Sequence, residues 1–282
     1  CLSGSSLQHV QKYFQPSSGF THTQNLNSVF IKKLGSNMTA FPFDTNPKEP
    51  IKLGLIVLSS DETIEDEFRA MLPKSCSLFQ TRIHSAPEVT PDTLMEMQAG
   101  LAASAAMIPP SFNVDVIGYA CTSGATMIGP RNVATEVQKV HPNSKVCTPI
   151  TAVMRALNTL CARKIGMVTP YIPDVSQEMR NLLIESGFEI SALVSFEVST
   201  EAIVARITAD AIKRAARAAA VDGADAVFVS CTNLRTVDVI DELEDELGIA
   251  IVTSNQALAW DMLTSVGIST AQSAVPGRLS KT

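Results

Sequence analysis

Two stretches of the chain repeat one pattern at a separation of 110 residues. "DVIGYACTSGAT" runs from Asp115 to Thr126, and "DAVFVSCTNLRT" runs from Asp225 to Thr236. In each stretch an Asp is followed by five residues and then by Cys-Thr, with a second Thr five places after the Cys. Another pair, "KLGLIV" from Lys52 and "KIGMVT" from Lys164, is separated by 112 residues. Two pairs at nearly the same offset indicate a duplicated unit.

Apolar runs alternate with helical patterns along each unit. Ile51–Leu58 is a continuous apolar run, which is typical of a strand buried on both faces of a parallel sheet. The same reasoning predicts further strands over 77–83, 114–121, 163–171 and 225–231, and helices over 62–73, 90–108, 177–187 and 202–220. Strands that alternate with helices predict an α/β fold. We therefore expect two pseudo-symmetric, duplicated α/β domains, each with a parallel sheet flanked by helices, and an active site in the cleft between them.

The chain divides into three predicted segments: a leader over 1–50, an N-terminal α/β half over 51–160 and a C-terminal α/β half over 161–282. Residues 1–43 contain no Asp or Glu and are rich in Ser, Asn, Gln and Thr. Such a composition buries little apolar surface, so we expect a loosely structured leader. We interpret it as translated sequence upstream of a start at Met38, or as residues added in cloning. An organelle-targeting peptide within 1–37 is the alternative.

The charge and cysteine content exclude several classes of protein. The formal net charge is −6, the pI is about 5.3, and Lys and Arg form no basic run, so we expect no nucleic-acid partner. The sequence contains no run of 18 or more apolar residues, so we expect no membrane span. The six cysteines form no CxxC pair and the four histidines are scattered. We infer free thiols, no metal site and a cytoplasmic location.

The repeated cysteines are the candidate reactive groups. Cys121 and Cys231 each follow a predicted strand, and ligands of parallel sheets bind beyond the carboxyl ends of the strands. We expect the residues after each cysteine to open a helix, whose N–H groups bind anions and lower the pKa of a thiol from about 8.5 toward neutrality. A carboxylate held between the two would have a thiol on each face, available for proton transfer or addition. The alternative is two core cysteines inherited for packing.

The motifs "GYACTSGA", "VSCTNLRT", "GLIVLSSDETIEDEF" and "GMVTPYIPDV" resemble the aspartate/glutamate racemase superfamily. The resemblance is greatest to its maleate cis–trans isomerase and arylmalonate decarboxylase branch, and within it to racemase-like proteins associated with ectoine utilisation. It extends over residues 51–270. It implies dimers or tetramers and a reaction that needs no cofactor.

The resemblance also implies roles for individual residues. Cys121 would be the nucleophile or first acid/base, and Cys231 its partner. Tyr171 would bind or orient the substrate carboxylate. Carboxylate groups would further be held by Ser60, Thr122, Ser123, Thr232 and Asn233. The decarboxylases carry Gly in place of the first cysteine, so the presence of both cysteines argues against decarboxylation.

Two positions depart from the pattern of maleate isomerases. Asp61 and Glu201 stand where those enzymes place Asn residues that contact the substrate. Two acids would repel a dicarboxylate. We therefore expect a substrate with a carboxylate and a cationic group, such as an amino acid. In the other reading, both acids are solvated or cap helices.

Taken together, these residues predict a cofactor-independent racemase or isomerase of a small carboxylic acid that uses two opposed cysteines. The alternatives are a maleate cis–trans isomerase, a lyase or decarboxylase of the same superfamily, and a non-catalytic two-lobed protein that binds carboxylates.

Overall fold

The structure, a computed structural model, describes residues 33–34, 38–39, 41–45, 49–221 and 223–282. It divides into two units, Cys1–Glu49 and Pro50–Thr282. In the first unit, β1 (Lys33–Leu34) pairs antiparallel with β2 (Met38–Thr39). Most of the predicted leader lies outside the described residues, so its loose structure and the start at Met38 stay predictions.

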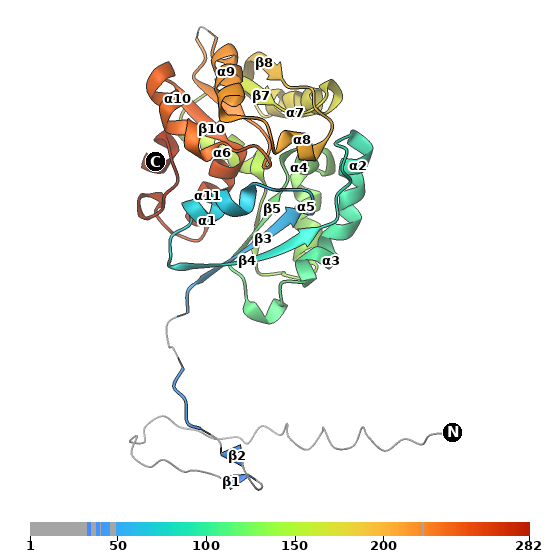
Figure 1. Ribbon diagram of the computed structural model, residues 1–282, viewed down its shortest axis with the longest axis vertical. Coiled ribbons are helices and arrows are strands. Elements are labelled where there is room, and N and C mark those ends of the chain that lie inside the picture. Colours follow the sequence, from blue (N-terminus) through green and yellow to red (C-terminus); the bar gives the residue numbers. More distant parts are fainter. Residues whose placement is uncertain (1–32, 35–37, 40, 46–48, 222) are drawn as a thin grey trace, which may run out of the picture. The chain divides into compact units, whose positions relative to one another are not determined.

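In the part of Pro50–Thr282 that is described, the strands form two four-stranded parallel sheets (Figure 1). The first sheet has the order β4-β3-β5-β6, and the second has the order β8-β7-β9-β10. The strands are β3 (Ile51–Leu58), β4 (Cys76–Ile83), β5 (Val116–Ala120), β6 (Lys145–Cys147), β7 (Lys164–Thr169), β8 (Glu189–Ser195), β9 (Ala226–Val229) and β10 (Ala250–Thr253). Because both sheets have the same order in chain sequence, the duplication and the α/β class predicted from the sequence are confirmed.

Helices flank both sheets (Figure 1). Those of the N-terminal half are α1 (Ile64–Met71), α2 (Pro91–Glu96), η2 (Met97–Gly100), α3 (Leu101–Ala106), η3 (Pro110–Phe112), α4 (Thr122–Ile128), α5 (Pro130–Gln138) and α6 (Pro149–Thr159). Those of the C-terminal half are α7 (Pro173–Glu185), α8 (Glu201–Val204), α9 (Ala209–Ala219), η4 (Val237–Val239), α10 (Ile240–Leu247), α11 (Ser254–Ser265), η5 (Thr270–Gln272) and η6 (Arg278–Lys281).

The aspartate of each repeat has the same structural role in both halves. Asp115 Oδ2 accepts a hydrogen bond from Lys52 N at 2.8 Å, and Asp225 Oδ2 accepts one from Lys164 N at 2.8 Å. Each Asp also donates its backbone N–H to the same lysine's carbonyl oxygen, at 2.9 and 2.7 Å. The pair thus ties the start of the cysteine-bearing strand to the start of the central strand. This contact explains why the Asp and the Lys recur together.

The last helix of each half packs across the boundary between the halves. Helix α11 contacts α6 and also β5 of the other half, and α6 contacts β10. The approach of α11 to β5 is close at Gly118, where a Cβ atom would lie 2.7 Å from Met262 Sδ. A side chain at this position would therefore push α11 away from the strand that precedes Cys121.

Two predicted helices are wrong in their extent. The helix expected over 90–108 is divided into α2, the 3-10 segment η2 and α3. The run expected over 202–220 is divided into α8 and α9, because Thr208 takes an extended conformation and its hydroxyl accepts a hydrogen bond from Ala211 N at 3.2 Å. A threonine that caps a helix in this way begins a new helix.

Candidate active site

Cys121 directly follows β5 and caps helix α4, as the sequence predicted. Its backbone is extended, and its sulfur accepts a hydrogen bond from Gly124 N at 3.1 Å. The Ser123 hydroxyl lies 3.6 Å from the same sulfur. The thiol is buried. It therefore sits beside the first turn of α4 with two neighbouring hydrogen-bond donors.

Cys231 follows β9 but does not open a helix, and here the sequence-based expectation is wrong. Thr232 and Asn233 form a turn, and the next helical residues are those of η4. The φ angle of Cys231 is +110°, in a region that residues with a side chain rarely adopt and that costs on the order of 1–3 kcal/mol. Its sulfur lies 3.4 Å from Asn233 N. The fold thus holds this cysteine in a strained backbone conformation.

Hydrogen bonds join the two cysteine loops to each other. Ser254 Oγ, on α11, accepts from Cys231 N at 3.0 Å and from the Thr122 hydroxyl at 2.8 Å. The Thr232 hydroxyl donates to Ala120 O at 3.2 Å, across the boundary between the halves. Ser254 is fully buried and is hydrogen-bonded to both loops, so it holds them at a fixed separation. Ser254 was not among the predicted site residues.

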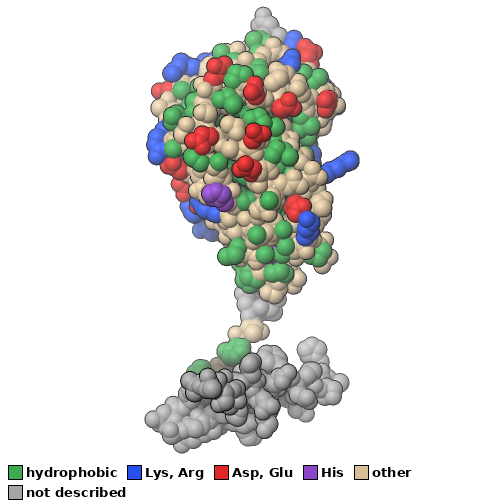
Figure 2. Space-filling model, turned by 90° about the vertical axis from the view of Figure 1, so that its right-hand side faces the viewer, with side chains coloured by type: hydrophobic (Ala, Val, Ile, Leu, Met, Phe, Trp, Pro, Cys, Tyr) green, Lys and Arg blue, Asp and Glu red, His purple; other side chains and the backbone are tan. Residues whose placement is uncertain are grey.

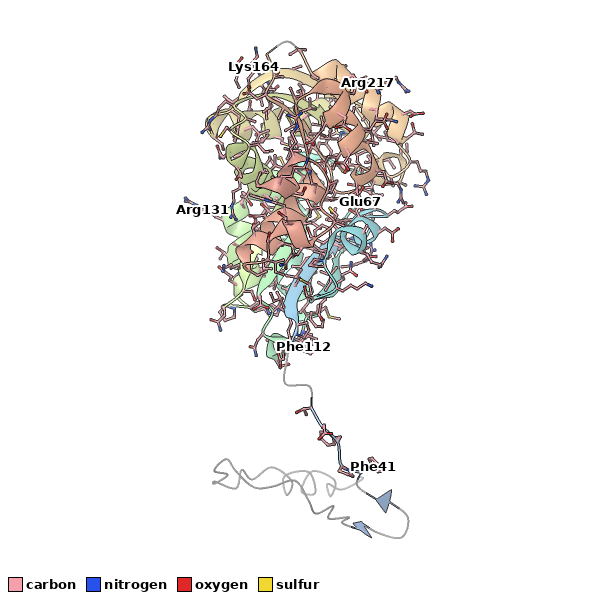
Figure 3. The ribbon with its side chains drawn as sticks, turned by 90° about the vertical axis from the view of Figure 1, so that its left-hand side faces the viewer. Phe41, Glu67, Phe112, Arg131, Lys164 and Arg217 are labelled. Atoms are coloured by element: carbon pink, nitrogen blue, oxygen red, sulfur yellow. The ribbon has the colours of Figure 1, made fainter. Side chains whose placement is uncertain are left out.

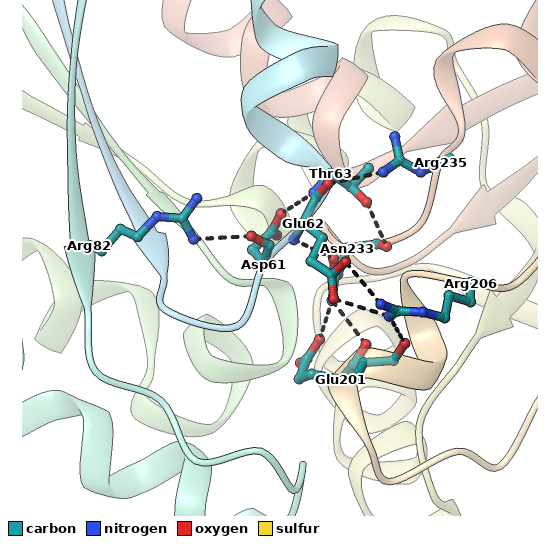
Figure 4. A network of polar contacts seen from close by, with 9 residues as sticks. Asp61, Glu62, Thr63, Arg82, Glu201, Arg206, Asn233 and Arg235 are labelled. Carbon is teal, nitrogen blue, oxygen red and sulfur yellow. Dashed lines mark hydrogen bonds and ion pairs between the residues drawn. The ribbon is translucent and has the colours of Figure 1, made fainter.

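Asp61 lies beside these loops, between β3 and α1. Its Oδ1 accepts hydrogen bonds from Thr63 N at 2.8 Å and Ile64 N at 2.9 Å, and so caps α1. Its Oδ2 is buried without a hydrogen-bond partner among the described residues. Arg82 donates to the backbone oxygen of Asp61 at 3.0 Å (Figure 4). The helix-capping reading is therefore correct for one carboxylate oxygen. Burial raises the pKa of Asp61, against the contacts with Ile64 N, Thr63 N and the Thr232 side chain, which lower it.

Glu201 is held against the Cys231 loop by an amide. Asn233 Nδ2 donates to Glu201 Oε2 at 2.7 Å and to Glu201 O at 3.2 Å (Figure 4). Asn233 Oδ1 accepts from Glu62 N at 2.9 Å. The Asn233 amide is thus occupied by protein groups rather than free for a substrate carboxylate. Glu201 is buried, which excludes the solvated reading of this residue.

Two loops cover this part of the site. They follow the equivalent strands β4 and β8, and they pair antiparallel through a bridge between Glu88 and Thr200. Val89 N donates to Ser199 O at 2.7 Å, and Glu201 N donates to Pro87 O at 3.1 Å. On the face shown in Figure 2, Asp and Glu side chains lie at the surface, some among apolar and uncharged side chains and some beside Lys or Arg. Asp61 and Glu201 differ from these because they are enclosed.

Burial and the two acids raise the pKa of both thiols. The pKa of Cys121 is raised to about 12, by burial first and then by Glu201 and Asp61. The pKa of Cys231 is raised well above its usual value for the same reasons, in the same order. The expected lowering of both thiol pKa values is therefore wrong. A cation beside the acids would offset their effect on the thiols.

Two tyrosines complete the surroundings of the thiols. The Tyr171 hydroxyl lies 3.4 Å from Ser230 Oγ, and its pKa is raised by burial and then by Cys231 and Cys121. Tyr119 was not among the predicted residues; burial and then Cys121 raise its pKa well above the usual value. Both phenols therefore face thiols. Ser60 is half-buried and its hydroxyl lies 2.9 Å from Ser85 Oγ, at the margin of this cluster.

The pKa of Glu201 makes stability depend on pH. It is raised from 4.5 to about 7 by burial, so between these pH values the folded protein binds more protons than the unfolded chain. The contribution of Glu201 to stability is fully present at and below pH 4.5 and falls by about 3 kcal/mol as the pH rises through 7. We expect Glu201→Gln to remove this slope, in urea unfolding measured at pH 5 and pH 7.5. The same pH dependence in both proteins would contradict this assignment.

In the described ranges, no group of three or more His, Cys, Asp or Glu side chains is placed to hold a metal ion. Among the described helices, none combines the length and the apolar character that crossing a bilayer requires. The cysteines of the described residues are all free thiols, and Cys161 is the exposed one.

A sequence model of the arylmalonate decarboxylase family matches residues 54–280. The chain belongs to this family. Its relatives include a maleate isomerase of Nocardia farcinica, 27% identical over 238 residues that cover 80% of this chain and 93% of the relative. An arylmalonate decarboxylase of Bordetella bronchiseptica is 31% identical over 139 residues, which cover 48% of this chain and 58% of the relative. These relatives of the chain are thus enzymes of the branch that its sequence motifs resemble.

Solved structures of the same branch share the fold. The Nocardia farcinica maleate cis–trans isomerase, in a mutant with a covalently bound succinylcysteine intermediate, superposes with a TM-score of 0.76 at 25% identity and covers 82% of this chain and 98% of its own. The maleate isomerase of Pseudomonas putida S16 with maleate gives a TM-score of 0.76 at 22% identity, with the same coverage. The fold predicted from the sequence is therefore that of these family members.

Proposed function

We propose that the chain is a cofactor-independent isomerase or racemase of a small carboxylic acid that also carries a cationic group, such as an amino acid. The observation that carries this proposal is the convergence of two thiols and two buried acids. Cys121 and Cys231 lie on loops that share Ser254, and the pKa values of both respond to Asp61 and Glu201.

The chemistry follows from this placement. One thiol, as thiolate, removes the proton from the carbon beside the substrate carboxylate, and the thiol on the other face delivers a proton to that carbon. The first thiol thereby gains a proton and the second loses one, so the configuration inverts without any other reactant. The N–H groups at the start of α4 and the Tyr171 hydroxyl are suited to hold the carboxylate.

The acids favour a cationic group on the substrate. Asp61 has a buried carboxylate oxygen without a partner among the described residues, which costs free energy until a donor arrives. An ammonium group supplies such donors. It also offsets the negative field that raises the pKa of the thiols, so binding of the substrate would activate them. Substrate binding and thiol activation are thus coupled.

Solvent-deuterium incorporation, followed by NMR over amino acids, diamino acids, maleate and arylmalonates, tests the function. We expect exchange at Cα of a cationic substrate, with inversion. Absence of exchange and of turnover across this panel, in a folded protein, would contradict the proposal and favour a non-catalytic carboxylate-binding protein.

Asp61→Asn tests the charge argument. The Asn side-chain oxygen can keep the two N–H contacts that cap α1, so the substitution removes charge and leaves the cap. We expect kcat/KM for a cationic substrate to fall by about 10- to 100-fold, the loss of a hydrogen bond to a charged group. Glu62→Gln is the matched control, because Glu62 is the adjacent acid but pairs with Arg206 at the surface. An unchanged kcat/KM in Asp61→Asn would refute the role of the charge.

Maleate cis–trans isomerisation is the second candidate. Relatives that align over 93% of their own length are maleate isomerases, and one solved relative carries a succinylcysteine intermediate. On this reading a thiolate adds to the alkene, the C–C bond rotates, and the thiolate leaves again. Asp61→Asn discriminates the two functions, because it removes a repulsion from a dicarboxylate and would then raise kcat/KM for maleate.

A further inference from the structure

Tyr119 is placed at Cys121 as Tyr171 is placed at Cys231. Of the three tyrosines in the chain, these are the two in the described residues, and both are buried. Tyr119 lies on β5, two residues before Cys121. Its counterpart in the duplicated half is Val229, so the repeat does not require a tyrosine there.

Gly124, in the first turn of α4, shows how close the Tyr119 hydroxyl lies to the Cys121 thiol. A Cβ atom built on Gly124 would lie 2.7 Å from the Tyr119 hydroxyl oxygen and 2.9 Å from Cys121 Sγ. The two atoms are therefore at most about 5.6 Å apart, and no side chain at position 124 separates them. The same point lies 2.8 Å from Met97 Cε.

The Tyr119 hydroxyl makes its hydrogen bond to a weak acceptor. The Tyr119 hydroxyl donates to Met97 Sδ at 3.7 Å, and a thioether sulfur is a poor hydrogen-bond acceptor. A thiolate is a far stronger one, because hydrogen bonds to a charged group are about twice as strong as neutral ones. When the Cys121 thiolate forms, the Tyr119 hydroxyl is therefore expected to exchange Met97 Sδ for the Cys121 sulfur as its acceptor.

We propose that Tyr119 is a positioning residue that donates its hydroxyl hydrogen bond to the Cys121 thiolate, leaving Met97 when that thiolate forms. With Gly124 N and the Ser123 hydroxyl, the sulfur then has three donors. The phenol keeps its own proton throughout, and its raised pKa agrees with this. This role rests on the proposed function, since only a reactive Cys121 needs such donors.

Two carboxylates near Cys121 act against its ionisation. Glu201 on α8 and Asp61 before α1 raise its pKa by their charge. Tyr171, after β7, also interacts with this thiol. The donors on β5 and at the start of α4 are therefore placed to stabilise a thiolate at this position against the two carboxylates.

Site-specific alkylation tests the assignment without any substrate. Wild type, Tyr119→Phe, Tyr171→Phe and Met97→Leu are treated with iodoacetamide at pH 9, and the rates at Cys121 and Cys231 are measured by peptide mass spectrometry. We expect Tyr119→Phe to lower the Cys121 rate relative to the Cys231 rate by about tenfold, since one hydrogen bond to a charged group is lost. Tyr171→Phe should instead lower the Cys231 rate more than the Cys121 rate.

Met97→Leu keeps the phenol and removes its competing acceptor, so the relative Cys121 rate should equal or exceed that of wild type. A Tyr119→Phe protein whose relative rates match wild type, or whose two rates fall together, would overturn the proposal. In Tyr119→Phe and Met97→Leu, Cys231 serves as the internal reference for an intact fold, and in Tyr171→Phe this reference is Cys121. Because no turnover is measured, failure of this experiment is distinct from failure of the proposed function, which the deuterium panel decides.

Discussion

Replacing either Cys121 or Cys231 by serine is expected to reduce isomerisation by about 10²- to 10⁴-fold, the contribution of a positioned acid or base. A serine hydroxyl ionises far less readily than a thiol, so it cannot serve as the base, and each face of the substrate needs its own group. Both single variants should therefore lose inversion. The measurement is kcat for conversion of one enantiomer into the other, or of maleate into fumarate, in each variant.

The two variants also separate racemisation from other chemistry. A racemase that retains one thiolate can still exchange a proton on that face, so one variant should keep deuterium exchange without inversion. Cys161→Ser is the matched control, because Cys161 is an exposed free thiol away from the described site, and its activity should equal that of wild type. Retention of full inversion in Cys121→Ser or Cys231→Ser would rule out the two-thiol mechanism.

Glu67→Ala is expected to lower the free energy of unfolding by about 3–5 kcal/mol, the cost of leaving several buried donors unpaired. Glu67, on α1, accepts hydrogen bonds from Thr236 N at 2.5 Å, Val237 N at 3.0 Å and Asn255 Nδ2 at 2.7 Å. Figure 3 shows Glu67 on α1, beside segments of the C-terminal half. Asn255 Nδ2 also donates to Thr232 O at 2.8 Å. One carboxylate thus binds the first helix to the strained Cys231 loop.

Urea unfolding at pH 7 measures this effect. Asp66→Ala is the matched control on the same helix, because Asp66 forms an exposed ion pair with Arg69 and its loss should cost about 0.5 kcal/mol or less. If Glu67→Ala lowered the free energy of unfolding by less than 1 kcal/mol, water or neighbouring groups would replace the carboxylate. The hydrogen bonds of Glu67 would then not hold the Cys231 loop.

The cysteine pair and the duplication could be predicted because they depend on spacing alone. The Asp of each repeat lies at the start of a strand and its Cys at the end, so the separation of Asp115 from Cys121 is the length of a buried strand. The same holds for Asp225 and Cys231. Continuous apolar runs then identified the parallel strands. These are local signals, and the structure agrees with them.

Two of the wrong predictions are the unbroken helix over 202–220 and the helix after Cys231. The first missed a local signal, and the second was overridden by tertiary contacts. Thr208 is a recognisable helix cap inside an otherwise helical run, and its effect was missed. Cys231 resembles Cys121 in its following threonine, yet its loop is drawn into a turn by Ser254 on α11 and by the Glu67 carboxylate. Neither contact is visible from the neighbouring residues, since Glu67 and Ser254 lie far from Cys231 in the chain.

By itself, the sequence determined the α/β class, the internal duplication and the two thiols at equivalent strand ends, because periodicity and repeat spacing carry that information. Only the tertiary structure decided the chemistry around those thiols. It encloses them with Asp61 and Glu201, so their pKa values rise instead of falling, and it brings Tyr119 and Ser254 to them. The physical reason is that burial and electrostatic fields depend on which distant residues share a space, and no spacing along the chain encodes that directly.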